Sequence, residues 1–292
     1  MGKLLRGMSR DGNARILVLD STDITAEATA FHHSAPTATA ALGRLLTGAS
    51  MIGSLMGEKE DRLTLAVSGN GPCGKLIAVS DWCGNVKGYV ENPAADPPRK
   101  KNKKLDVGAA VGQGTLAVIR EHGTATPQIG TVELVSGEIA EDITRYFAES
   151  EQIPTLCALG VLVGADGVLI ASGGVLIQLL PFADETVIAG LEKNAAALSD
   201  ISRLFREGKT PKEVADIAMA GIEYDIFDEL TVTYRCDCGR VRMRDGIRRV
   251  GEKEILRMLR EEEAEGHPRE LEAVCRFCGK KYRFTESELL KK

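Results

Sequence analysis

Two close pairs of cysteines near the C-terminal end constrain this chain more than any other feature. Cys236 and Cys238 form a C-x-C pair, and Cys275 and Cys278 form a C-x-x-C pair. Short pairs of this kind on tight turns present four thiolates to one tetrahedral Zn²⁺ ion. A segment of roughly 60 residues with few aromatic side chains builds only a small core, so a bound metal is a sensible source of its stability. The pattern predicts one zinc ion per chain.

The residues beside the cysteines support a metal site. Gly239 and Gly279 directly follow the two pairs, where glycine lets the backbone turn back under an ion. Arginines also flank the first pair, and they have two interpretations. They could contact nucleic acid, or they could offset the formal charge of −2 on zinc with four thiolates. The second is favoured because a run of glutamates in the same segment would repel phosphates. The arginines are Arg235, Arg240, Arg242, Arg244, Arg248 and Arg249.

The cysteine pattern alone leaves several functions open. One is a purely structural zinc site, and another is a zinc ribbon that binds nucleic acid, although common zinc ribbons use C-x-x-C twice. A third is a thiol–disulfide oxidoreductase that uses Cys275 and Cys278, but no thioredoxin-like βαβ pattern surrounds that pair. Thiols one residue apart can also form a strained disulfide, and strained disulfides are labile and regulatory.

Composition narrows the cellular compartment and the kinds of partner expected for this chain. Its 292 residues predict about two domains, and a net charge of −5 argues against a protein built wholly to bind nucleic acid. The seven cysteines are an odd number, no secretory signal opens the chain, and no apolar run is long enough to span a membrane. We therefore expect a cytoplasmic protein with no membrane or nucleic-acid partner. Cys73, Cys83 and Cys157 lack ligand spacing and are expected to be free thiols.

Hydrophobic patterning predicts an α+β fold for the first part of the chain. The alternating and apolar runs predict a mixed α/β body with an antiparallel-rich sheet. The segment 69–74 matches G-x-G-x-x-G, but a strand pattern follows it, so a hairpin turn is predicted there rather than a nucleotide site. Strands are predicted over 14–19, 62–68, 75–81, 86–90, 115–120 and 131–135 and twice or three times within 157–180, helices over 22–33, 37–56 and 137–149, and an exposed loop over 92–104.

A helical segment follows this body. Residues 184–207 have helical periodicity, and Thr210-Pro211-Lys212-Glu213 is a helix start with a capping box. The resulting division is an N-terminal body (1–182), a helical linker (183–230) and a small C-terminal zinc-binding module (231–292). The linker carries an apolar seam that something must cover in the resting protein, and a client-binding role for it is a hypothesis. The seam residues are Val187, Leu191, Leu198, Ile201 and Phe205.

The chain resembles the heat shock protein 33 family of redox-regulated holdase chaperones over essentially its whole length. Besides the cysteine pairs, the resemblance rests on PTATAALGRLLTGASMIGSLM (36–56), GNGPCGKLIAVSD (69–81), GTVELVSGEIAEDITRYFAESEQIPT (130–155) and GGVLIQLLP (173–181). The family's four zinc ligands match Cys236, Cys238, Cys275 and Cys278. The spacer between the pairs is a few residues longer than usual, with the excess around Gly266-His267-Pro268.

The resemblance implies a chaperone and not an enzyme. The reduced, zinc-bound form would be inactive. Oxidation would form the disulfides Cys236–Cys238 and Cys275–Cys278, eject the metal, and unfold the module and the linker. The exposed apolar surface would then hold unfolding client proteins without ATP, and the oxidised protein would form a homodimer. Because C-x-x-C closes with less strain than C-x-C, we expect Cys275–Cys278 to form first.

Overall fold

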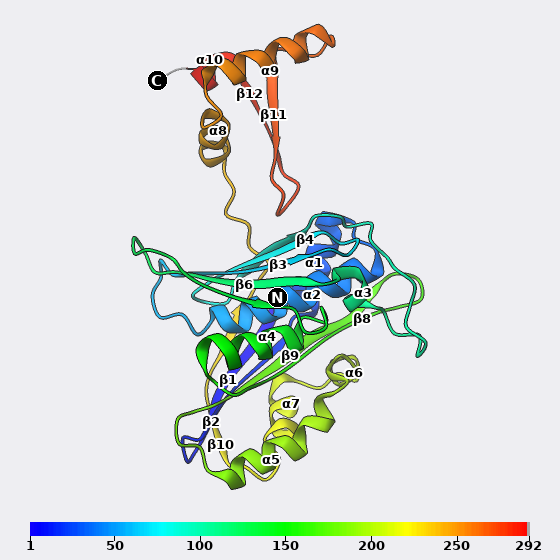
Figure 1. Ribbon diagram of the computed structural model, residues 1–292, viewed down its shortest axis with the longest axis vertical. Helices are drawn as coiled ribbons and strands as arrows, with labels where there is room; N and C mark the ends of the chain where they lie inside the picture. The colour runs from blue at the N-terminus through cyan, green and yellow to red at the C-terminus, as the bar shows by residue number, and fades with distance from the viewer. Residues whose placement is uncertain (291–292) are drawn as a thin grey trace. The chain divides into compact units, whose positions relative to one another are not determined.

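The computed structural model describes residues 1–290, and the chain divides into two compact units. The first unit comprises Met1–Arg235 and the second begins at Cys236. All strand pairs within the named sheets are antiparallel, and helices pack on them, so the predicted α+β class is confirmed (Figure 1). The three-part division, with boundaries after residues 182 and 230, stays a prediction.

The first unit contains two five-stranded sheets. The first sheet has the order β10-β1-β2-β9-β8 and joins the two ends of the unit, because β10 pairs with β1. Neither β1 nor β10 is expected from the sequence patterns, since each mixes charged and apolar residues. Its strands are β1 (Gly2–Ser9), β2 (Ala14–Asp20), β8 (Thr155–Val163), β9 (Leu169–Leu179) and β10 (Tyr224–Val232).

The second sheet has the order β5-β4-β3-β6-β7, which confirms the predicted meander. The glycine-rich segment forms the turn between β3 and β4, where Gly74 has a positive φ of 63°, so the hairpin-turn prediction is confirmed. The strands are β3 (Arg62–Gly69), β4 (Lys75–Asp81), β5 (Val86–Val90), β6 (Gly114–Glu121) and β7 (Gln128–Glu133).

Helix α2 (Pro36–Gly53) packs between the two sheets and contacts strands of both. Its small and apolar side chains are buried on nearly every face, which is typical of a helix in the middle of a core. Helix α1 (Thr22–His32) precedes it, and α3 (Val107–Val111) lies against it. This packing forms the larger core of the unit.

The helix predicted over 137–149 begins at Ala140 in the structure, and its last part is a π-helix. Ile139 has a φ of 72°, and the carboxylate of Asp142 accepts hydrogen bonds from the backbone N–H groups of Val135 (2.7 Å) and Ile139 (2.8 Å). These bonds hold the chain in a turn before the helix. The result is α4 (Ala140–Tyr146), followed by the π-helix η1 (Phe147–Glu151).

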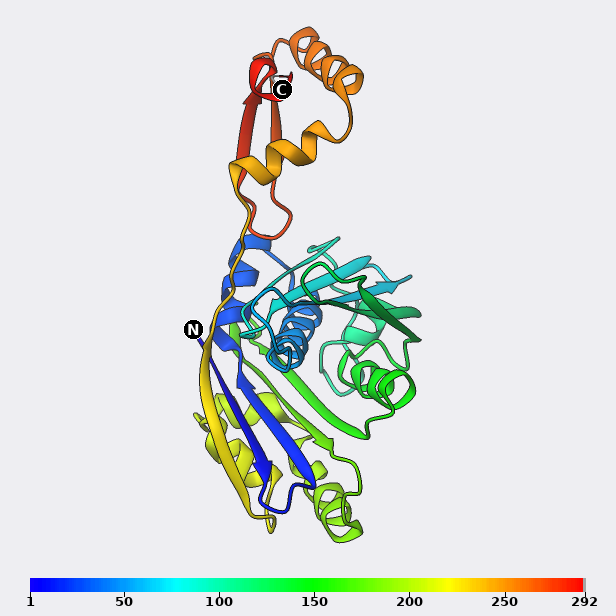
Figure 2. The same ribbon diagram turned by 90° about the vertical axis from the view of Figure 1, so that its left-hand side faces the viewer.

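Strand β2 has a continuously apolar sequence because both of its faces are buried. Leu17 and Leu19 belong to the core around α2, whereas Ile16 and Val18 belong to a second core on the other face of the sheet. A strand that is buried on both faces has no polar side to present. Figure 2 shows the helices of residues 185–218 against this second face.

The helical segment after β9 is broken rather than continuous. It consists of α5, a short 3₁₀ turn η2, α6 and α7, and the chain leaves helical geometry at Asp200 (φ −128°, ψ 59°). The predicted capping box is confirmed, since the Glu213 N–H donates to Thr210 Oγ1 and the Thr210 N–H donates to the Glu213 carboxylate. The elements are α5 (Glu185–Ala195), η2 (Ala196–Leu198), α6 (Ile201–Arg206) and α7 (Pro211–Ala218).

The second unit is a hairpin with three helices. Strands β11 and β12 pair over five residues each, and a core of six buried side chains lies beside them. These core residues are Ile255, Leu259, Leu271, Tyr282, Phe284 and Leu289. The elements are α8 (Arg240–Arg248), α9 (Glu252–Ala264), β11 (Glu270–Val274), β12 (Lys281–Thr285) and α10 (Glu286–Leu290).

Candidate metal centre

The turn of the β11–β12 hairpin holds the second cysteine pair. The Cys275 N–H donates to the carbonyl of Lys280 (2.9 Å), and the Gly279 N–H donates to the carbonyl of Cys275 (2.8 Å). Gly279 has a φ of 69°, which confirms the predicted role of this glycine in the turn. Gly239 is different: its φ of −156° is ordinary extended backbone at the start of α8, so the turn predicted there is wrong.

The structure brings the four predicted ligands together. The Sγ atoms of Cys236, Cys238, Cys275 and Cys278 all lie within 4.8 Å of one another. Cys236 Sγ lies 3.6 Å from Cys275 Sγ, and Cys238 Sγ lies 3.4 Å from Cys278 Sγ. Zinc–sulfur bonds of about 2.3 Å in a tetrahedron place the sulfurs about 3.8 Å apart. The donor set and its spacing therefore fit one Zn²⁺ ion.

Tyr282 adds a hydrogen bond that the sequence did not reveal. Its hydroxyl lies 3.2 Å from Cys238 Sγ, and the tyrosine side chain is buried. Although burial opposes ionisation, this hydroxyl and the neighbouring thiols hold the pKa of Cys238 below its usual value. Burial raises the pKa of Cys236. Four thiols in one small space do not ionise together without a cation, and a divalent metal supplies that charge.

The arginines beside the first pair bind carboxylates and backbone of the same unit. Arg242 pairs with Asp237 (2.9 Å) and Arg240 pairs with Glu288 (2.6 Å). Arg248 donates to two backbone carbonyls at the end of the chain (2.8 and 3.0 Å). The guanidinium of Arg240 also lies over the Phe284 ring. The contacts of Arg240 and Arg248 tie α8 to α10 and β12, and Arg244 pairs with the adjacent Asp245 (3.0 Å), so four of the six predicted arginines have contacts within this unit.

The other three cysteines lie in the first unit and are free, as predicted. Burial raises the pKa of Cys73 to about 11 and that of Cys157 to about 12. Burial is also the main cause of the raised pKa of Cys83. Thiols held in the protonated form react slowly with oxidants. None of these three thiols belongs to the four-cysteine cluster of the second unit.

The apolar seam lies against the first sheet. Its five side chains are each exposed by 7% or less and share one cluster with residues of β1, β2 and β9, including Leu5, Ile16 and Val175. All members of this cluster come from the first unit. The seam residues are Val187, Leu191, Leu198, Ile201 and Phe205.

Two glycines that sequence reasoning missed let α6 approach the sheet. Gly160 of β8 and Gly173 of β9 are directly opposite in register. A Cβ atom on Gly160 would lie 2.7 Å from both Ile201 Cγ2 and the backbone nitrogen of Ser202. A Cβ atom on Gly173 would overlap the Phe205 ring. We define this glycine pair as the α6 seat. Its sequence signal is weak, because glycine in a strand has several other causes.

The fold and the site define an α+β protein with a buried apolar helical segment and a separate four-cysteine unit that can hold one metal ion. The family model described as "Hsp33 protein" matches residues 2–285. The 33 kDa chaperonin of Clostridioides difficile is 42% identical over 288 residues, covering 98% of this chain and 97% of that protein. The 33 kDa chaperonin of Acetivibrio thermocellus is 39% identical, covering 99% and 95%.

The solved structures agree. The crystal structure of the 33 kDa chaperonin from Thermotoga maritima matches with a TM-score of 0.89 and 35% identity, over 98% of this chain and 96% of that one. The chain belongs to the Hsp33 family, the redox-regulated holdase chaperones. The four-cysteine cluster corresponds to the zinc site of that family. Among residues 1–290, no helix is both long and apolar enough to cross a bilayer.

Proposed function

We propose that Cys236, Cys238, Cys275 and Cys278 are the zinc ligands and the redox switch of this chaperone. The observation that carries the proposal is the convergence of their four Sγ atoms within 4.8 Å in a unit with a core of only six buried side chains. Structural zinc contributes on the order of 10–16 kcal/mol of apparent binding energy. Whole domains are stable by only about 5–15 kcal/mol. Loss of the metal therefore unfolds the second unit.

Oxidation removes the metal by consuming its ligands. Four zinc-bound thiolates react with two molecules of hydrogen peroxide and four protons, giving two disulfides, four water molecules and free Zn²⁺. Formation of each disulfide removes two electrons from a pair of sulfurs, and one molecule of hydrogen peroxide accepts them. We assign the pairs Cys236–Cys238 and Cys275–Cys278 from the family resemblance. These bonds close very small loops and leave the two cysteine segments unlinked, so they constrain the unfolded chain little and do not replace the metal.

Hydrogen bonds in the first unit are expected to stop the unfolding that begins in the second unit. The Val86 N–H donates to the carbonyl of Thr233 (3.0 Å), the Arg235 N–H donates to the carbonyl of Val86 (2.8 Å), and the Tyr234 hydroxyl donates to the carbonyl of Gly88 (2.7 Å). These bonds fasten the residues just before Cys236 to β5. We infer that metal loss unfolds the chain up to this point and leaves the sheet of β1 and β10 in place.

The client surface is proposed to be the seam together with the sheet face beneath it. Burial of a large apolar side chain contributes about 1.5–3 kcal/mol, so the five seam residues bind α5–α6 firmly to the sheet. Because every member of this cluster lies in the first unit, metal loss alone does not remove the docking. We expect full activation to require a second stress, such as warming, that releases the linker (183–230). The released surface then binds unfolding proteins.

The setting and the assembly state complete the proposal. A reducing compartment keeps four thiolates available for zinc, which supports a cytoplasmic location.

We propose that the oxidised protein dimerises, because two released apolar faces bury each other when no client is present. Sedimentation of reduced and oxidised protein tests this, and a monomer in both states contradicts it.

One experiment tests the switch. Reduced and oxidised protein are compared in a single client-aggregation assay while a chromogenic chelator reports zinc release. Protection is expected only in samples that have lost zinc. The variant Cys275→Ser is expected to lose zinc binding, whereas the control Cys157→Ser retains zinc and redox control. Protection by the unmodified chain while it keeps its zinc, or no protection by that chain after zinc loss with warming, contradicts the proposal.

Two further measurements test the details. Leu198→Ser with Ile201→Ser is expected to reduce client protection by the oxidised protein, and unchanged protection would remove the seam from the client surface. Mass spectrometry of a timed peroxide reaction is expected to detect Cys275–Cys278 before Cys236–Cys238. Early bridging of the first pair alone would reverse that order.

A further inference from the structure

A cavity of about 300 Å³ lies in the first unit beside the α6 seat. One wall is the basic loop of residues 99–104, the second is strand β8, and the third is the turn between η2 and α6. The loop contributes Arg99, Lys103 and Lys104, and the turn contributes Ser199, Asp200 and Ser202. The cavity therefore joins the body to the helical segment that the chaperone must release.

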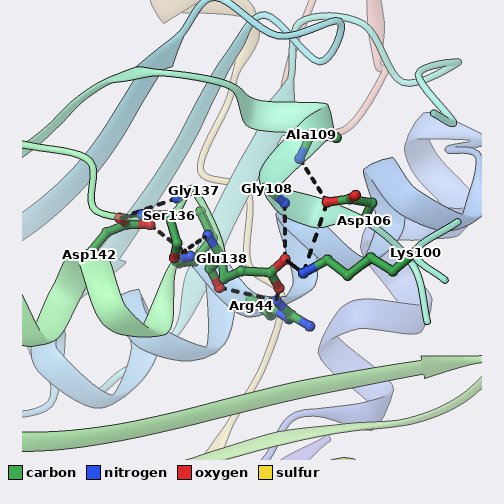
Figure 3. A network of polar contacts seen from close by, with 10 residues as sticks. Arg44, Lys100, Asp106, Gly108, Ala109, Ser136, Gly137, Glu138 and Asp142 are labelled. Atoms are coloured by element: carbon green, nitrogen blue, oxygen red, sulfur yellow. Dashed lines mark hydrogen bonds and ion pairs between the residues drawn. The ribbon is translucent and has the colours of Figure 1, made fainter. Parts of the chain in front are cut away.

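A network of ion pairs anchors the basic loop. Glu138 accepts hydrogen bonds from Arg44 (2.5 Å), from Lys100 (2.5 Å) and from the Gly108 N–H (3.2 Å). Figure 3 shows Glu138 between these partners, with Asp106 on the other side of the Lys100 ammonium. The carboxylate of Glu138 is thus fully engaged by Arg44 and Lys100. It does not neutralise the other cations of the loop.

Three further cations of this tightly bonded turn line the cavity. The Lys103 N–H donates to the carbonyl of Lys100 (2.8 Å), and the Lys100 N–H donates to the carbonyl of Lys104 (2.9 Å). Lys103 has a φ of 66°, in the left-handed region. Within residues 1–290, Arg99, Lys103 and Lys104 form no ion pair with a carboxylate. The turn therefore holds three like charges close together at the mouth of a cavity, which favours a multivalent anion.

We propose that this cavity binds an oligophosphate group, either free or carried by a small molecule. Several phosphate oxygens match three separate cations better than one carboxylate does. The hydroxyls of Ser199 and Ser202 supply polar contacts on the opposite wall, and β8 supplies an apolar surface. Asp200 is the only carboxylate on that wall and accepts a hydrogen bond from Ser202 (3.3 Å). The phosphates consequently lie toward the loop.

This site deepens the proposed function and rests on it for its regulatory consequence. A ligand that touches both the loop and residues 199–202 binds the docked segment better than the released one. Binding therefore shifts the equilibrium toward the docked, inactive form. For a ligand that binds only the docked form, a concentration 100 times the Kd raises the ratio of docked to released protein about 100-fold, and residual binding to the released form reduces this shift. The anion would delay activation without touching the metal centre.

Isothermal titration calorimetry of the reduced, zinc-loaded full chain with sodium tripolyphosphate tests binding. The variant Lys103→Glu/Lys104→Glu is expected to bind at least tenfold more weakly. The control Lys59→Glu/Lys253→Glu changes net charge equally at exposed positions and should bind as the unmodified chain does. It also has the same zinc centre, so any extraction of zinc by the phosphate appears equally in both variants.

A second titration with magnesium-free ATP distinguishes the source of the phosphates. Tighter binding of ATP than of tripolyphosphate indicates that β8 holds an organic group, and equal binding indicates recognition of the phosphates alone. No binding of either compound, or equal affinity in the loop variant and the control, overturns the proposal. Because no client or oxidant is present, these outcomes are independent of the proposed chaperone mechanism.

Discussion

Gly160→Ala is expected to raise the fraction of molecules with a released helical linker while zinc is still bound. The three atoms nearest to an added Cβ all belong to α6, namely Ile201 Cγ2 (2.7 Å), the Ser202 nitrogen (2.7 Å) and Ser202 Cβ (2.9 Å). Ordinary contacts between carbon atoms need about 3.5 Å or more, so α6 must retreat by roughly 1 Å. A backbone atom is among the obstacles, which means that a side-chain rotation does not relieve the overlap.

The magnitude follows from the cost of overpacking. Inserting a methyl group into a well-packed site costs about 1–3 kcal/mol, which lowers the ratio of docked to released α6 by about 5- to 150-fold. Gly160 is the cleaner choice of the two seat glycines. An added Cβ on Gly173 would also lie 2.6 Å from the Leu19 carbonyl oxygen, in the sheet itself.

The assay uses reduced, zinc-loaded protein. Gly160→Ala is expected to suppress aggregation of a warmed client without oxidant, and trypsin should cut faster after Arg203 and Arg206 in α6. The zinc content should be unchanged. A folded Gly160→Ala protein with normal proteolysis and no activity in the reduced state would refute the argument that close packing at the seat holds the linker.

Substitution of a second glycine is expected to have the opposite effect and to favour the docked state. Gly190 lies inside α5, and a Cβ there would meet only Ile222, at an ordinary 3.4 Å. Gly190→Ala should therefore gain about 1 kcal/mol of helix propensity without strain. We expect it to slow activation by oxidant and warming. Faster activation would show that stiffening α5 does not favour the docked state.

Three smaller predictions concern other contacts. Tyr282→Phe removes the hydroxyl that contacts a zinc-ligand thiol, so zinc transfer to a chromogenic chelator should be several-fold faster; an unchanged rate would make the contact incidental. Thr210→Ala removes the cap of α7 and should cost about 1 kcal/mol, measured as faster proteolysis of the linker. The hydrogen bond from Arg6 lowers the pKa of Asp228 below its ordinary value of 3.8. The ion pair therefore stabilises β10 fully above pH 3.8. This stabilisation is lost as the pH falls through the lower pKa that Asp228 has in the folded protein. Asp228→Asn should flatten acid unfolding below pH 4, and an unchanged acid limb would exclude this pair as its source.

The sequence predicted the parts of this protein that depend on local chemistry. The C-x-C and C-x-x-C pairs predicted the four cysteines that the structure brings together in one cluster, because the spacing of thiol ligands is visible in the sequence. The capping box of α7 and the meander over 62–90 were equally readable. Each of these features is signalled by residues within a few positions of one another, although the two cysteine pairs themselves meet across 39 and 40 positions.

Long-range pairing was not readable. Strand β10 finds its partner in β1 across more than 200 residues, and neither strand has a clean alternation of apolar and polar residues. The α6 seat was missed for the same reason, because Gly160 and Gly173 gain their meaning only from Ile201 and Phe205 lying above them. The Tyr282 contact to Cys238 depends on the fold of the hairpin. Such features follow from tertiary contact, which a single sequence does not display.

The β1–β10 pair also sets the order of events during synthesis. The first strand of the protein has an open edge until Tyr224–Val232 has left the ribosome, and at about 5–20 residues per second that takes roughly 10–50 seconds. The nascent chaperone therefore exposes an unpaired strand for most of its own translation. All four clustered cysteines follow this strand in the chain, so the strand that closes the sheet emerges from the ribosome before the four-cysteine unit does.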